Sequence, residues 1–170
     1  MNLRLMGAIL VVAGCGAVGF SVAAGYRREE QALQRLLPAL EIMICELRYR
    51  NSALPELCAM AAQQVGGGIG GVLARLSQLL TQQVFPDPAG CMASAIAQWP
   101  KLPDAPRREL QLLGTSLGRF DAQGQLQGLE SVKELVQRDL AGLRSGLEGQ
   151  LRACRTLGLC AGAALAILLI

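Results

Sequence analysis

The stretch LLGTSLGRFDAQGQ, Leu112 to Gln125, predicts how this chain turns from one helix into the next. Gly118 falls one residue past an apolar stripe that ends at Leu117, where a left-handed helix cap is expected. Asp121 precedes the next apolar stripe, where its carboxylate can accept a hydrogen bond from a free N–H group of the first helical turn. The stretch is therefore predicted to be a corner between two helices.

Two chemical alternatives for this stretch have less support. A phosphate-binding P-loop needs Lys and Ser or Thr after its glycines, but Gly118 is followed by Arg119 and Phe120. A calcium loop needs several oxygen ligands at alternate positions, and Asp121 stands alone. Because backbone N–H groups at a helix start attract anions, anion binding at Gly118 and Arg119 stays open as a minor alternative.

The composition predicts an all-α fold. Hydrophobic residues make up 52% of the 170 residues and aromatic residues only 4%, so the apolar content is mainly aliphatic. A chain of this length can build one domain with its own core. The net charge of +3 comes from 16 basic and 13 acidic residues that alternate along the chain, which argues against a nucleic-acid partner.

Charged residues avoid both ends of the chain. Arg4 is the only one before Arg27, and none follows Arg155. Leu5 to Ala24 is an apolar segment of 20 residues, about the length that crosses ~30 Å of hydrocarbon. Thr156 to Ile170 has 15 residues and would reach ~22 Å as a helix, so it is expected to span a thinned bilayer or to enter one leaflet.

The first apolar segment also has features of a cleaved signal. Val12 to Cys15 resembles a lipobox, and SVAA before Gly25 resembles a signal-peptidase site. Cleavage at the lipobox would leave a mature chain that begins at Cys15 and continues apolar, where a polar tether is expected. We therefore favour a retained membrane helix, with a cleaved signal or lipoprotein as the alternative.

Basic residues flank the inner side of both segments, which predicts the orientation. By the positive-inside rule the middle of the chain is expected to face the cytoplasm. The predicted domains are an N-terminal transmembrane segment (1–26), a cytoplasmic helical bundle (27–155) and a C-terminal membrane segment (156–170). The flanking bases are Arg27, Arg28, Arg35, Arg152 and Arg155.

The first part of the middle segment predicts helices interrupted by proline and glycine. Glu29 to Arg50 carries a leucine stripe at helical spacing, and Pro38 is expected to kink it near Gln34. SALPE, Ser52 to Glu56, predicts a turn and the start of a short helix ending near Gln64. GGGIGG, Gly66 to Gly71, predicts a flexible joint.

Four further helices are expected after this joint. Asp87 and Asp104, each followed closely by proline, mark two helix starts. The last helix is the longest, because a proline-free stripe of coiled-coil type runs from Asp121 into the C-terminal membrane segment. The predicted ranges are Val72 to Val84, Asp87 to Trp99, Asp104 to Leu117, and Asp121 onward.

The side chains that catalysis commonly uses are scarce. The chain has no histidine, which excludes Ser-His and Cys-His pairs and histidine metal ligands. Glu46 and Glu56 are expected to be solvated or to cap helices rather than to form an acid/base pair. Buried free thiols are favoured over disulfides or a metal cluster, because no C-x-x-C occurs. We expect no enzyme activity, cofactor or metal. The cysteines are Cys15, Cys45, Cys58, Cys91, Cys154 and Cys160.

Several motifs together resemble the stage III sporulation protein AB family across essentially the whole chain. The most specific positions are Gly114, Gly118, Asp121, Gly124 and Gln125. The chain departs from the family at Pro38, inside the first helix, and at Ala53, where proline is usual. The motifs are GAILVVAG (7–14), GYRRE (25–29), LRYRNSALPE (47–56), Trp99, LGTSLGRFDAQGQ (113–125) and RTLGLCAG (155–162).

The resemblance implies a component of the channel in the outer forespore membrane, supplied from the mother cell, with its head in the mother-cell cytoplasm. It also implies an antiparallel helical bundle similar to the cytoplasmic domain of the type II secretion F subunit. The implied partners are membrane lipid, a secretion-type ATPase and other channel subunits. The alternative function is a lipid- or signal-anchored helical adaptor of unrelated role.

Two clusters of charged residues are candidates for the partner surface. Arg48 and Arg50 lie near the SALPE turn, and Arg107, Arg108 and Glu109 lie on one predicted helix. Because charged contacts are screened by salt, we expect docking through these residues to be modest in affinity and salt-sensitive.

Overall fold

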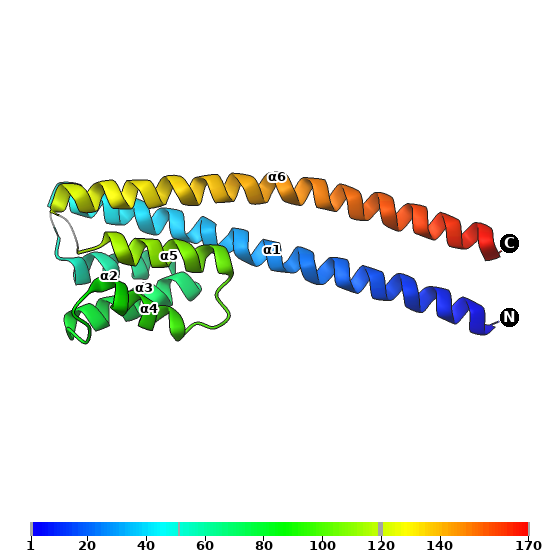
Figure 1. Cartoon of the computed structure of the whole chain (residues 1–170), viewed down its shortest axis with the longest axis horizontal. Helices are drawn as coiled ribbons and strands as arrows, with labels where there is room; N and C mark the ends of the chain where they lie inside the picture. Colours follow the sequence, from blue (N-terminus) through cyan, green and yellow to red (C-terminus); the bar gives the residue numbers. More distant parts are fainter. Residues whose placement is uncertain (1, 51, 119–120, 170) are drawn as a thin grey trace. The chain divides into compact units, whose positions relative to one another are not determined.

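The computed structural model describes the backbone of residues 2–50, 52–118 and 121–169, and the side chains of residues 24–146 except 51, 119, 120 and 122. These residues form helices and no strand, which confirms the all-α prediction. Figure 1 labels the six helices of the described residues: α1 (Asn2–Arg50), α2 (Leu54–Val65), α3 (Gly67–Thr81), α4 (Pro88–Ala97), α5 (Asp104–Ser116) and α6 (Ala122–Leu169).

The chain divides into two compact units. The central unit is Glu29–Ala141, and the terminal unit comprises Met1–Arg28 and Gly142–Ile170. No helical stretch within the described residues combines the length and hydropathy that a bilayer crossing requires. The predicted membrane segments, Leu5 to Ala24 and Thr156 to Ile170, lie almost entirely outside the residues whose side chains are described. The division into 1–26, 27–155 and 156–170 therefore stays a prediction.

The core of the central unit is built from all six helices. α2 packs on α3, α3 on α4, and α4 on α5. Within this unit α1 and α6 lie side by side, as Figure 1 shows and two ion pairs between them confirm. Large fully buried side chains from α1 to α5 include Leu33, Leu36, Leu40, Met43, Leu57, Leu73, Leu76, Met92, Leu110 and Leu113, and α6 adds Leu129 and Val136.

α1 continues through Pro38 to Arg50. Proline has no N–H group, so the carbonyl of Gln34 loses its usual helical partner. Both Pro38 and Gln34 are exposed, whereas Leu36 and Leu40 are buried. The missing hydrogen bond thus lies on the hydrated side of the helix, where water can replace it.

The predicted flexible joint at GGGIGG is wrong, because α3 already begins at Gly67. Gly66 alone separates α2 from α3, with φ of +60°, a value that L side chains rarely adopt. Ser77, one turn before the end of α3, donates its hydroxyl to the carbonyl of Pro55 at 2.7 Å. The chain therefore reverses direction at Gly66, and the hydrogen bond from Ser77 to Pro55 joins α3 to the start of α2.

The later glycines of this run allow close packing rather than motion. A Cβ atom at Gly70 would lie 2.9 Å from the carbonyl oxygen of Ala62 on α2. A Cβ atom at Gly71 would overlap the indole ring of Trp99, which follows α4. Bare backbone at these two positions lets α2 and the tryptophan approach α3 directly.

The predicted start of the next helix at Asp87 is confirmed. The Asp87 carboxylate accepts a hydrogen bond from the Gly90 N–H group at 3.1 Å, and Pro88 is the first residue of α4. The preceding loop contains Gln83, which has a positive φ of 50°. α3 ends at Thr81, three residues earlier than predicted.

Candidate functional site

The corner predicted at Gly118 has the expected geometry. α5 ends at Ser116, and Gly118 follows with φ of +74°. A Cβ atom at Gly118 would lie 2.5 Å from Cγ of Pro88, the first residue of α4. Both the backbone conformation and the space therefore require glycine.

Asp121 caps the start of α6, as predicted. Its Oδ1 accepts a hydrogen bond from the Gly124 N–H group at 3.0 Å, and its carbonyl accepts one from Gln125 N–H at 2.9 Å. Arg119 and Phe120 lie outside the described residues, so the anion alternative at this corner stays untested. Asp121, Gly124 and Gln125 thus form the start of α6, which with 48 residues is one residue shorter than α1, so the prediction that the last helix is the longest is wrong.

Gly114 serves the packing of α5 on α4. A Cβ atom there would lie 2.6 Å from Cβ of Met92. Gly114 and Gly118 thus fix α5 against α4 at two positions one turn apart. The motif builds a rigid junction of α4, α5 and α6.

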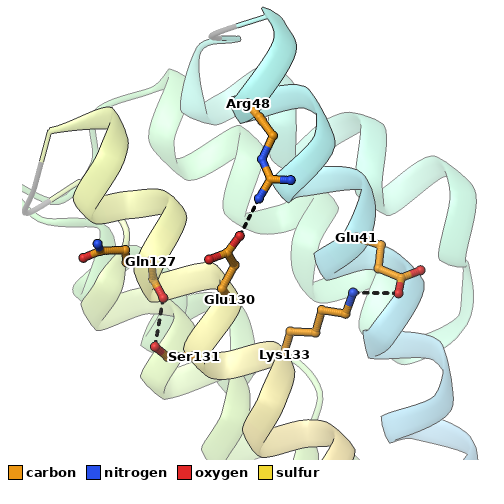
Figure 2. A network of polar contacts seen from close by, with 6 residues as sticks. All are labelled: Glu41, Arg48, Gln127, Glu130, Ser131 and Lys133. Carbon is orange, nitrogen blue, oxygen red and sulfur yellow. Dashed lines mark hydrogen bonds and ion pairs between the residues drawn. The ribbon is translucent and has the colours of Figure 1, made fainter.

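A polar seam joins α1 and α6 within the central unit (Figure 2). Nη2 of Arg48 on α1 lies 2.5 Å from Oε1 of Glu130 on α6. Further along the two helices, seven residues from Arg48 on α1 and three from Glu130 on α6, Nζ of Lys133 lies 2.9 Å from Oε1 of Glu41. Both pairs are partly exposed, so each is worth only about 0.2–1 kcal/mol. The two pairs therefore add little to the free energy of folding, and their main effect is to set the register of α1 against α6.

The last turn of α1 presents an aromatic side chain between two arginines, a group that we name the Arg48–Arg50 corner. Tyr49 is 77% exposed, the highest value among the exposed large hydrophobic side chains of the described residues. Nη1 of Arg50 lies 3.6 Å from Oε1 of Glu46, a loose contact of an exposed guanidinium. Tyrosine and arginine are enriched among residues that dominate binding energies at interfaces.

The sequence analysis named Arg48 and Arg50 and missed Tyr49. Its position is a readable signal, because it stands outside the leucine stripe that includes Leu40 and Leu47. Tyr49 therefore lies on the polar face of α1, where its ring is accessible to a partner.

The three charged residues predicted on α5 do not form one surface. Arg108 is exposed and its Nη2 lies 3.8 Å from Oδ2 of Asp139 on α6. Nη2 of Arg107 donates to the carbonyl of Leu102 at 3.1 Å, which holds the loop before α5. Glu109 is only 3% exposed, so its placement on a docking surface is wrong.

Helical geometry explains the burial of Glu109. Residues four positions apart share a face of a helix, and Glu109 lies four residues from both Ala105 and Leu113. Both of these are buried. The position therefore belongs to the inner face of α5 whatever its side chain.

A model of the stage III sporulation protein AB family matches residues 4–170. The chain belongs to this family. A solved structure titled Stage III sporulation protein AB superposes with a TM-score of 0.63 at 14% identity, covering 71% of this chain and 97% of that one. At this identity the match shows a shared fold. No curated protein sequence matches the chain.

Membership of the stage III sporulation protein AB family supports a role in the stage III sporulation apparatus. The resemblance stated from the sequence motifs is thus confirmed, and the Gly114–Gln125 motif of the family has a structural explanation in the three-helix junction. The described side chains contain no group of three potential metal ligands.

The described cysteines of this family member differ in exposure. Cys58 and Cys91 are buried free thiols, whereas Cys45 is exposed on α1, contrary to the expectation of buried thiols. Burial raises the pKa of the Cys58 thiol to about 12, which suppresses the reactive thiolate at neutral pH. Cys15, Cys154 and Cys160 lie outside the described side chains.

Proposed function

We propose that this chain is a non-enzymatic membrane component of the channel between mother cell and forespore, and that its central unit docks a secretion-type ATPase. Family membership supports the place in the sporulation apparatus. The observation that carries the docking surface is Tyr49, 77% exposed between Arg48 and Arg50. In this proposal the ATPase supplies the chemistry and the helical unit supplies its attachment.

The chemistry of the Arg48–Arg50 corner fits an acidic partner with a pocket for an aromatic ring. The ring of Tyr49 offers apolar area at low entropic cost, and the flanking guanidinium groups can bind carboxylates. Arg48 already pairs with Glu130 and Arg50 with Glu46, so acidic groups of the partner compete with internal ones. Docking is therefore modest in strength, salt-sensitive, and dependent on Tyr49 for most of its energy.

Binding of the full chain in detergent micelles to the ATPase tests the docking surface. Tyr49→Ala is expected to weaken binding about tenfold or more, and the paired change Arg48→Glu with Arg50→Glu to abolish it at low salt. Leu112→Ala on α5 and Arg138→Glu on α6 change an exposed apolar and an exposed basic residue elsewhere and should bind normally. Equal affinity of the Tyr49 variant and the two controls would contradict the proposed surface.

The proposed topology puts the membrane segments Leu5 to Ala24 and Thr156 to Ile170 in the outer forespore membrane and the central unit in the mother-cell cytoplasm. Cys45 is a natural reporter because it is exposed in the central unit. A membrane-impermeant maleimide should label it only after permeabilisation, with Cys45→Ser as the control for other thiols. Labelling of Cys45 in intact cells would overturn this topology.

The non-enzymatic assignment and the retained anchor need separate tests. The purified full chain is expected to show no ATP hydrolysis, alone or with lipid. The alternative, a signal- or lipid-anchored adaptor, predicts an intact mass that lacks the residues before Cys15 or Gly25. A full-length mass favours the membrane component.

A further inference from the structure

Glu109 is a carboxyl group inside the central unit that the docking function does not use. It is 3% exposed on the inner face of α5, between positions occupied by Ala105 and Leu113. Its Oε2 atom is buried and has no hydrogen-bond partner among the described residues. An ionised carboxylate in such a position is unfavourable, because Oε2 is shielded from solvent and accepts no hydrogen bond from the described residues.

The neighbouring charges make ionisation still less favourable. Asp139 on α6 faces Glu109 with a like charge, and Arg108 on α5 opposes it. Arg108 is shared, since its Nη2 lies 3.8 Å from Oδ2 of Asp139 and the side chain is 69% exposed. Burial is the main cause that raises the pKa of Glu109, Asp139 adds to it, and Arg108 partly offsets it.

The other helices packed on α5 offer no further cation among the described contacts. From α1, Glu29 reaches α5 and accepts a hydrogen bond from the Ala105 N–H group at 3.0 Å, which brings another carboxylate. α4 has no charged side chain, and its titratable group is the buried Cys91 thiol.

Glu109 lies in an antiparallel hairpin formed by α5 and α6. At one end a Cβ atom at Gly128 would lie 2.7 Å from Cβ of Ser116, so the helices touch closely there. At the other end the link is the long pair of Arg108 and Asp139. The helices thus approach closely near the corner, whereas the ion pair between them beside Glu109 is long.

We propose that Glu109 is a proton-operated latch of this hairpin: the protonated carboxyl allows α5 to stay closed on α6, and its ionisation opens the end near Asp139. The inference is independent of ATPase docking, because it concerns contacts inside the central unit. Opening of the hairpin would make the packing of α6, which pairs with α1 through the polar seam, depend on the local pH.

The sign of the effect follows from proton linkage. A carboxyl whose pKa is raised on folding binds its proton more tightly in the closed hairpin than in the open one. Its stabilising contribution is complete below the ordinary Glu value of 4.5 and is lost as pH rises through the raised value. The closed state is therefore favoured by acid and weakened toward neutral and alkaline pH.

Hydrogen exchange of the full chain in detergent micelles tests the latch, with rates corrected for the intrinsic effect of pH. Between about pH 4.5 and about pH 8, protection of residues 129–141 should fall in the wild type, at most about tenfold per pH unit for one proton. Glu109→Gln should keep high protection throughout this range. Glu134→Gln, which changes an exposed carboxylate on α6, should behave as the wild type.

A second variant keeps the test decisive if the first one misfolds. Asp139→Asn removes the like charge and frees Arg108, so the fall in protection should move to lower pH. A flat wild-type profile, a Glu109→Gln variant that keeps the wild-type pH dependence, or an unchanged profile in Asp139→Asn would each overturn the latch.

Discussion

Replacing Gly118 by alanine tests the three-helix junction most directly. Alanine at φ of +74° costs about 1–2 kcal/mol in backbone strain. Its Cβ would also lie 2.5 Å from Cγ of Pro88, and relieving such an overlap costs about 1–3 kcal/mol. The expected loss of stability is thus about 2–5 kcal/mol, which lowers Tm by roughly 8 °C or more for a unit of this size.

The single tryptophan of the chain, Trp99, reports on this transition because it packs on α3 in the central unit. Thermal unfolding of the full chain in detergent micelles is followed by its selectively excited emission. Gly142→Ala, in α6 just beyond the central unit, is the control for the substitution itself: a Cβ atom there meets nothing within 4 Å and alanine favours the helix, so the transition should not fall. A Gly118→Ala transition that coincides with that of the control would refute the corner.

Three other perturbations have defined outcomes. Gly71→Val should lower the unfolding transition and shift the tryptophan emission, because the new side chain would occupy the space of the indole ring. A maleimide added to the folded chain at neutral pH should modify Cys45 much faster than Cys58, and equal rates by peptide mapping would contradict the assigned burial. A double-mutant cycle on Arg48→Ala and Glu130→Ala should give a coupling energy below about 1 kcal/mol, since a larger value is inconsistent with an exposed pair.

The parts of the fold that short-range signals determine could be predicted from the sequence. Asp87 and Asp121 were identified as helix starts, and each accepts a hydrogen bond from an N–H group three residues later. Gly118 was identified as a helix stop because the apolar stripe ends one residue before it, and its positive φ confirms this. In these cases the cause and its effect lie within a single turn of chain.

Features that depend on distant residues were missed. GGGIGG was predicted to be flexible, but the ring that requires Gly71 belongs to Trp99, 28 positions later. Glu109 was assigned to the surface by its chemical type, although its spacing from Ala105 and Leu113 places it inside. Side-chain chemistry is a weaker guide than helical position when the two disagree.

The pairing of α1 with α6 imposes an order on how the molecule is made. Arg48 and Glu130 are 82 residues apart, so translation at about 5–20 residues per second separates their emergence by about 4–16 s. During that interval α1 lacks the helix that lies beside it in the finished unit, and Arg48 lacks its partner. Helices α2 to α5 contact their neighbours along the chain and can assemble meanwhile. The nascent chain thus carries α1 without its long-range partner until α6 arrives, and truncation before Glu130 would leave that side of α1 uncovered.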